Sequence, residues 1–170
     1  MGRLDYKRGR FDSDYETNDI FGGLDGFTDV FGDQLDYYRF DRETSTMDDI
    51  YDEATGEAGR QFKPAIQIPA IHVTHVEGEN KNGDMGFYYN DDLEATFSFR
   101  TIQGVGLTLA DIKTGNYLKD RVVYDDKVFR VEQLSIEGQI QKRDIIVALR
   151  STQMKPDELI DDPQFSRWSD

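Results

Sequence analysis

The stretch that decides the fold is DRVVYDDKVFRVEQLSIEGQIQKRDIIVALR, residues 120–150. Runs of Val, Ile, Leu and Phe alternate in it with acidic or glycine-containing breaks. The pair Asp125-Asp126 is a tight-turn candidate after the strand expected at Arg121–Tyr124, and Gly138 marks a second turn. The stretch therefore predicts three consecutive strands joined by short turns.

Upstream of this stretch the sequence predicts further strands. AIQIPAIHVTHVEG (65–78) is strand-like, and its Pro69 favours a sheet edge or a break, because proline has no N–H to donate. LEATFSFRTI (Leu93–Ile102) alternates apolar and polar residues, which indicates a half-buried strand. Five or six short strands within about 90 residues favour a mainly β fold, a small β-barrel or sandwich, over an α/β fold.

Two segments of this β region are expected to leave the strand pattern. In GVGLTLADIKTGNYL (104–118), Thr108 could cap a short helical turn ended by Gly115, or the segment could be a loop long enough to project. KPDELIDDP (155–163) is an exit from the last strand, with one helical turn started by Pro156.

Composition limits the possible functions. The chain has 170 residues and no cysteine, so it forms neither disulfides nor thiolate metal sites. Its net charge is −14, which makes the surface acidic. Such a surface repels nucleic acid, because phosphate binding needs clustered Lys and Arg. The N-terminus has no apolar run after its basic residues, which excludes a secretory signal, and nothing approaches the length of a membrane span.

Residues 1–60 differ from the rest of the chain. They carry 16 Asp and Glu against 7 Lys and Arg, and 10 of the 21 aromatic residues. Their spacing shows neither a sustained helical stripe nor strand alternation, so we expect a long irregular N-terminal arm. The arm would precede a β-barrel domain over 61–160 and a C-terminal tail over 161–170.

Within the arm, DIFGGLDGF (19–27) resembles DVFGDQLDYY (29–38), with a shorter echo in DDIYDE (48–53). Each places an aliphatic and an aromatic residue after an Asp. Either the repetition is chance in a segment of low variety, or the pairs are apolar plugs for a groove on a neighbouring subunit. The second interpretation gives these candidate subunit-contact anchors: Ile20, Phe21, Val30, Phe31, Tyr37, Tyr38 and Tyr51.

No motif of the sequence predicts catalysis or a cofactor. His72 and His75 lie three apart, which on a strand places them on opposite faces, so we expect one to pack inward and the other to be exposed rather than both to bind a metal. Adjacent carboxylates, such as Asp125-Asp126, diverge or face solvent. The segment DGFTDVFGD (25–33) lacks the spacing of a calcium loop, and GVG (104–106) lacks that of a nucleotide loop.

The order of features over residues 51–159 resembles the head-to-tail connector proteins of tailed bacteriophages, in particular the stopper or head-closure kind. Three segments carry the resemblance: YDEATGEAGRQFKPAIQIPAIHVTHVEGE (51–79), LEATFSFRTI with GVGLTLADI (93–112), and YLKDRVVYDDKVFRVEQLSIEGQIQKRDIIVALRSTQMKPDELIDDP (117–163). The last of these is the most specific. None of the matching motifs is catalytic, and residues 1–50 have no counterpart in the pattern.

The resemblance implies a ring of copies that seals the portal channel of a virion assembled in the bacterial cytoplasm. Its partners would be copies of itself, a portal or adaptor protein on the head side and a tail terminator or tail tube on the tail side, with DNA passing an acidic wall. A loop would project into the channel, and its candidate residues are Asn82, Gly83 and Asp84, or Gly104, Gly106 and Asp111. The arm would be ordered only in the assembly.

Three alternatives remain at this stage. A tail terminator or tail-tube component would carry helices packed on a sheet, whereas this sequence indicates little helix. An acidic decoy that mimics DNA would act as a monomer on basic proteins. A small β-barrel hydrolase would need an assembled site, for which the sequence provides no residues.

Overall fold

A computed structural model describes residues 13–48, 50–51, 59–83, 86–140 and 142–168. Strands account for 44% of the described residues against 29% in helices, so the predicted mainly β class is confirmed. The elements follow in the order α1 (Ser13–Phe31), β1 (Asp33–Tyr38), β2 (Ile66–Ala70), β3 (His72–Gly83), β4 (Gly86–Ser98), α2 (Phe99–Gly104), α3 (Leu109–Thr114), β5 (Arg121–Tyr124), β6 (Lys127–Ile140), β7 (Arg143–Gln153), η2 (Glu158–Asp161) and η3 (Pro163–Trp168).

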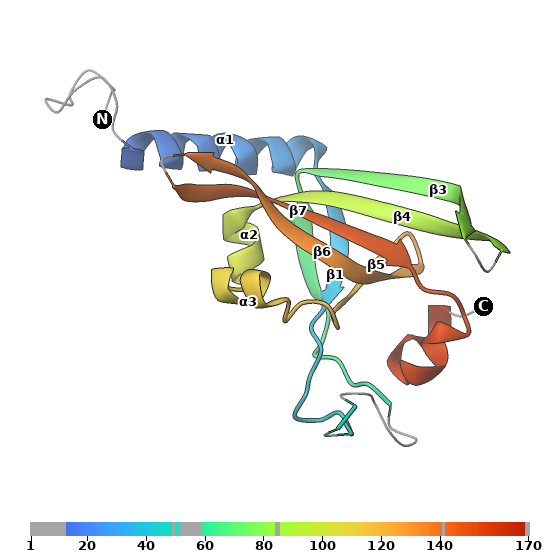
Figure 1. The fold of residues 1–170 in the computed structure, drawn as a ribbon. Helices are drawn as coiled ribbons and strands as arrows, with labels where there is room; N and C mark the ends of the chain where they lie inside the picture. The colour runs from blue at the N-terminus through green and yellow to red at the C-terminus, as the bar shows by residue number, and fades with distance from the viewer. Residues whose placement is uncertain (1–12, 49, 52–58, 84–85, 141, 169–170) are drawn as a thin grey trace, which may run out of the picture.

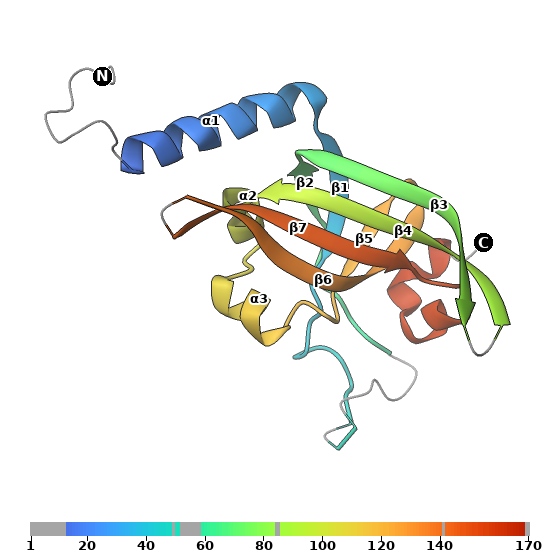
Figure 2. The ribbon, with the colours of Figure 1, turned by 45° about the horizontal axis from the view of Figure 1, so that its top comes forward.

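The seven strands form one antiparallel sheet in the order β2-β1-β5-β6-β7-β4-β3. The sheet is strongly curved (Figures 1 and 2) but not closed, so the expectation of a barrel or a two-sheet sandwich is wrong. Its two edge strands, β2 and β3, are consecutive in the chain and separated only by Ile71. The N–H of Ile71 donates to the carbonyl of Thr96 at 2.8 Å. The two edges therefore meet at one corner without a ladder between them.

The predicted edge position of Pro69 is confirmed. Pro69 faces Gln34 of β1 in the register, and the other side of β2 has no strand partner among the described residues. A proline therefore costs the sheet little here.

The sheet is covered on both faces, which explains why consecutive residues of the short strand β5 are buried. The larger core cluster includes Tyr37, Val122 and Phe129 together with residues of α2 and α3. Their chain neighbours point to the other face, where Tyr38, Val123 and Val128 pack against η2 and η3. Full members of the second cluster are Tyr38, Phe62, Val123, Val128, Met154, Leu159 and Phe165.

The C-terminal segment belongs to this second core and is not a free tail. Phe165 has no exposed surface and packs edge-on against Tyr38 and Phe62. The expectation of a tail over 161–170 is therefore wrong for η3, because its aromatic residues fill the outer face of the sheet. The helical turn predicted for the exit is confirmed as η2.

An ion pair ties this segment to the sheet. The Nε of Arg121 donates to Oδ2 of Asp162 at 2.9 Å, and Nε of Arg60 lies 3.5 Å from Oδ1. Arg121 and Asp162 are both buried, with 1% and 0% of their surface exposed. Arg121 Nη1 also donates to the carbonyls of Lys119 and Asp120. Together with Arg60, this pair joins three segments that are far apart in sequence.

Residues 13–38 are ordered against the rest of the chain, so the irregular arm is wrong for this part. α1 is a helix of 19 residues, and β1 pairs with β2 on one side and β5 on the other. Tyr37 donates its hydroxyl to the buried Asp120 at 2.7 Å. Burial raises the pKa of Asp120, although this bond and the N–H of Phe40 oppose the shift. The order of β1 therefore needs no neighbouring subunit.

α1 runs across the sheet at one end of the molecule (Figures 1 and 2). Its buried side carries Phe21, over whose ring the Arg100 guanidinium lies at 4.2 Å from the ring centroid. Arg100 also donates to Asn18 at 2.7 Å, and Arg143 forms an ion pair with Asp14. No described helix combines the length and the hydropathy needed to cross a membrane.

Two strands end or bend where the sequence did not predict it. β4 ends at Ser98, and Phe99 begins α2, so the strand pattern expected to Ile102 is wrong for its last four residues. β6 continues through Gly138 to Ile140, so the turn comes later than expected. A bulge between Val131 and Gln133 breaks the alternation of β6.

The short helix predicted after Thr108 is confirmed as α3, and the alternative of a projecting loop is wrong. Thr108 and Asp111 form a capping box, and Gly115 ends the helix in the left-handed conformation at φ 74°. Hydrogen bonds from the Thr108 N–H, from Asn116 and from the Thr108 hydroxyl lower the pKa of Asp111 to about 2.

This cap predicts an acid-sensitive part of the stability. Because the folded pKa of about 2 lies below the usual 3.8, Asp111 stabilises the fold above about pH 4, and this contribution is lost as the pH falls toward 2. We expect Asp111→Ala to be less stable than the parent at pH 6, with the difference shrinking between pH 4 and pH 2. Urea unfolding at each pH measures it, and a difference independent of pH would contradict the assignment.

Candidate functional site

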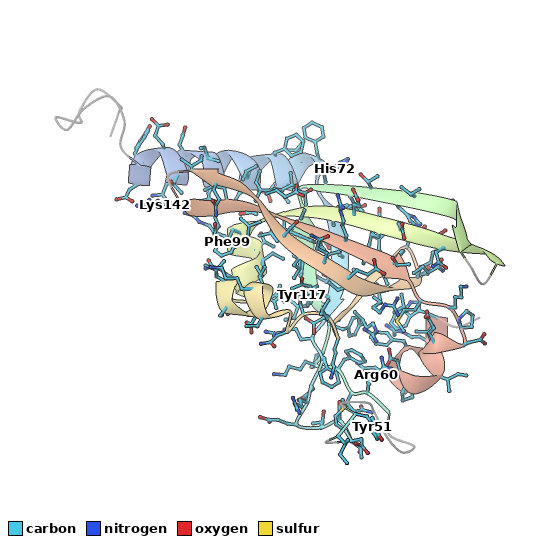
Figure 3. The ribbon with its side chains drawn as sticks, in the orientation of Figure 1. Tyr51, Arg60, His72, Phe99, Tyr117 and Lys142 are labelled. Carbon is cyan, nitrogen blue, oxygen red and sulfur yellow. The ribbon has the colours of Figure 1, made fainter. Side chains whose placement is uncertain are left out.

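The seven candidate anchors differ widely in how far the structure buries them. Phe21, Tyr37 and Tyr38 are buried within their own chain, with at most 6% of their surface exposed, so they are core residues and not plugs for a neighbour. Val30 and Phe31 are 71% and 72% exposed on α1. Of the remaining two, Ile20 is half-buried and Tyr51 is exposed, at the end of the molecule opposite α1 (Figure 3).

The two candidate channel loops differ in their position relative to the core. Asn82 and Gly83 lie at the end of β3, in a hairpin with β4 that extends away from the core (Figure 1), and Asp84 is outside the described residues. The segment with Gly104, Gly106 and Asp111 is folded onto the core instead. The carbonyl of Gly106 accepts a hydrogen bond from Arg39 at 2.7 Å, and the neighbouring Val105 and Leu107 are buried. The β3–β4 hairpin is therefore the better candidate for a projecting loop.

A polar cluster lies where β3 and β4 approach the β5–β6 turn. The Nε2 of His75 lies 3.3 Å from Oδ2 of Asp91, and Lys127 Nζ lies 2.7 Å from the same oxygen. Lys127 Nζ also lies 3.4 Å from Oε1 of Glu77. The His75 ring packs edge-on against Tyr124 and Phe129. The cluster joins the β3 edge to the start of β6.

The charges of this cluster are mutually stabilised. Burial acts to raise the pKa of Asp91, but hydrogen bonds from Lys127 and the Gly78 N–H outweigh it and lower the pKa. The hydrogen bond to Asp91 in turn raises the pKa of Lys127. Both groups are therefore charged at neutral pH and form a stable ion pair.

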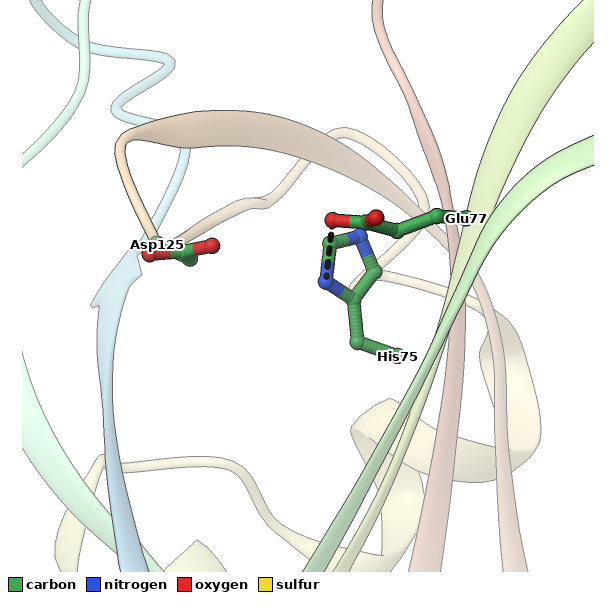
Figure 4. A group of neighbouring side chains, drawn as sticks. All are labelled: His75, Glu77 and Asp125. Atoms are coloured by element: carbon green, nitrogen blue, oxygen red, sulfur yellow. Dashed lines mark ion pairs between the residues drawn. The ribbon is translucent and has the colours of Figure 1, made fainter.

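In the same region, three side chains place potential metal-ligand atoms within 4.8 Å of one another: His75, Glu77 and Asp125 (Figure 4). Glu77 and Asp125 are exposed, and Nδ1 of His75 is 3.9 Å from Oε1 of Glu77. The ammonium of Lys127 already neutralises Glu77 and would repel a second cation. The arrangement therefore favours an ion-pair network. As predicted, the two histidines separate: His75 packs inward, whereas His72 is exposed.

An open groove of about 740 Å³ lies on the outer face of β2, β1 and β5, beside η3. It is lined by Gln34, Asp36, Gln67, Val123, Tyr124, Asp125, Asp126, Arg167 and Trp168. Tyr124 donates to Asp33 at 2.6 Å, and this bond raises its pKa to about 12. Asp125 and Asp126 are exposed in the wall of this groove.

The sequence predicted only part of the exposed apolar surface on the outer face of α1. Phe27, which was not among the candidates, is 48% exposed and stacks against Phe31 with ring centroids 5.0 Å apart. Together with Val30 these residues form an apolar knob, defined here as Phe27, Val30 and Phe31. The signal was present as the spacing i, i+3 and i+4, which places three apolar residues on one helix face.

Comparisons with known proteins do not assign a family. No family model matches the sequence, and no curated protein matches it. Among solved structures, a chain of the "Virion of native gene transfer agent (GTA) particle" aligns with 72% of this chain and 94% of its own length, at 10% identity and a TM-score of 0.43.

Proposed function

We propose that the protein is a structural component of a tailed-phage virion that forms a ring at the head-to-tail junction. The observation that carries the proposal is the shape of the sheet. The hairpins β3–β4 and β6–β7, with strands of 11 to 14 residues, extend beyond the core toward opposite sides (Figures 1 and 2). Projecting hairpins and an exposed apolar knob offer surfaces for assembly, as the resemblance over residues 51–159 also implies.

Within this class, a head-closure stopper is the first candidate. The β3–β4 hairpin supplies the projecting loop that a stopper needs, with Asn82 and Gly83 near its tip. The excess of Asp and Glu, with a net charge of −14, would let DNA pass without adhesion. Neighbouring rings on the head and tail sides would be its other partners.

A tail terminator or tail-tube component is the second candidate, and α1 favours it. Helices packed on a sheet are the feature that distinguished this class in the sequence analysis, and α1 contacts β2, β4 and β7. The two candidates differ in where the ring lies along the neck.

Imaging of purified particles tests the proposal. We expect cryo-electron microscopy of particles containing this chain to show it as a ring around the DNA channel, and peptide mass spectrometry to give the same fixed copy number. Density next to the portal supports a stopper, and density at the top of the tail tube supports a terminator. A chain that is absent from particles and binds basic proteins as a monomer would instead support the acidic decoy.

A further inference from the structure

The apolar knob has no cover within the described chain. Val30 and Phe31 are more than 70% exposed, and Phe27 is about half exposed. Three neighbouring large apolar residues at one helix end form a patch that soluble proteins usually bury against a partner. Aromatic residues in such patches commonly carry a large share of the binding free energy.

Next to the knob, α1 carries three glycines whose surroundings are open. A Cβ atom added at Gly22, Gly23 or Gly26 would meet nothing within 4 Å. Glycine in a helix costs up to about 1 kcal/mol relative to alanine, so this surface does not serve the stability of the single chain. It leaves room for another backbone to approach the helix closely next to the knob.

The negative charge around the apolar knob limits which surfaces can bind to it. Residues 13–38 contain seven Asp and Glu and no Lys or Arg. Asp25 and Asp29 lie beside the knob, and neither has a basic partner within the described part of the chain. A symmetric contact of α1 with α1 would bring like charges together, which is unfavourable. The occupant must present positive charge around an apolar contact.

The opposite end of the same molecule presents positive charge around an apolar residue. The exposed Lys63, in the segment before β2, and the exposed Lys113, in α3, lie there, as do Leu118, which is 51% exposed, and the half-buried Lys119. We call these four residues the basic end. Figures 1 and 2 place α3 and the segment before β2 on the side of the sheet away from α1, and Figure 3 shows Tyr117, the residue before Leu118, on that side.

The two carboxylates closest in sequence to Lys113, Leu118 and Lys119 are engaged within the chain. Asp111 accepts hydrogen bonds from Thr108 and Asn116, and Asp120 is buried against Tyr37 and Phe40. They therefore leave the positive charge of the exposed Lys113 available to a partner.

We propose that the occupant of the apolar knob is a second copy of this chain, bound head to tail, with the knob of one copy on the basic end of the next. Such a contact uses two different patches, so it either closes into a ring or continues as a filament. The inference rests on the proposed ring and names the interface that would build it.

Two variants remove one patch each without touching the core. Val30→Ser with Phe31→Ser removes the knob, and Lys63→Glu with Lys113→Glu reverses the charge of the basic end. Matched controls are Ile160→Ser, a 77% exposed apolar residue of η2, and the exposed Lys155→Glu. Circular dichroism and urea unfolding verify that every variant keeps its fold.

Sedimentation and native mass spectrometry then measure self-association. We expect the parent and both controls to form rings, and each double variant alone to associate at least roughly 30-fold more weakly, as the loss of one hot spot predicts. A mixture of the two double variants retains one intact interface per pair, so it should give 1:1 dimers and nothing larger.

The contrary outcomes separate the two proposals. Rings of parental affinity from both variants would overturn this interface while leaving the ring intact. Two monomeric variants that fail to pair on mixing would overturn the head-to-tail arrangement. A parent that stays monomeric at all concentrations would overturn the interface and the ring together.

Discussion

Replacing Asp162 by Ala should lower the free energy of unfolding by about 3–5 kcal/mol, the usual cost of breaking a buried ion pair. The change leaves the Arg121 guanidinium without its carboxylate at a site where only 1% of the arginine is exposed. Two carbonyl acceptors remain for Arg121, but they carry no net charge. Equilibrium unfolding in urea measures the loss.

Two comparisons identify the cause of this loss. Glu94→Ala breaks the ion pair with Arg150, whose two side chains are 56% and 59% exposed, and should cost at most about 1 kcal/mol. Arg121→Met with Asp162→Leu removes both charges, and this double variant should be more stable than Asp162→Ala alone. If Asp162→Ala costs no more than Glu94→Ala, the buried pair does not hold the C-terminal segment as described.

Gly32→Ala should destabilise the protein by about 3 kcal/mol, since overpacking against a fixed backbone costs about that much. Gly32 joins α1 to β1, and a Cβ atom there would lie 2.4 Å from the Thr28 carbonyl oxygen and 2.6 Å from that of Ala70. Both obstacles are backbone atoms, and the Gly32 N–H is bonded to the same Thr28 oxygen at 2.8 Å. The helix must shift to relieve the contact.

The matched control, Gly26, lies six residues earlier, within α1. Gly26→Ala adds a Cβ atom that meets nothing within 4 Å, so it should stabilise the fold by up to about 1 kcal/mol through helix propensity. Both variants are measured by urea unfolding at a concentration where the chain is monomeric. Equal effects of the two substitutions would contradict the close approach at Gly32.

Where the sequence predicted the fold well, a local physical signal was strong. The hairpin at Asp125-Asp126 is confirmed, with both residues at positive φ, 48° and 57°, which Asp tolerates better than most residues do. The helix after Thr108 is confirmed because its first and last residues carry caps. The faces of the strand at Leu93 are confirmed as far as Phe97.

α1 and β1 were missed because their signals are mixed. The buried side of α1 is marked by Thr17 and Phe21, whereas Phe27 and Phe31 are exposed on another side, and three glycines interrupt the helical pattern. In β1, Tyr37 and Tyr38 are buried on opposite faces, so no alternation appears. Only the tertiary contacts of the sheet decide these elements.

The same mixture limited the prediction of interaction residues. An aromatic side chain that follows an Asp looks alike in the sequence whether it fills the core, as Phe21 does, or lies on the surface, as Phe31 does. The bulge at Val131 and Gln133 likewise has no marker in the sequence. Both depend on neighbours distant in the chain.

The position of β1 between β2 and β5 sets an order of events during synthesis. Tyr37 donates its hydroxyl to a residue 83 positions later, and β1 has no second strand partner until Arg121–Tyr124 has left the ribosome. At about 5–20 residues per second this delay lasts several seconds. During that time the aromatic residues of β1 are not yet buried and are accessible to chaperones.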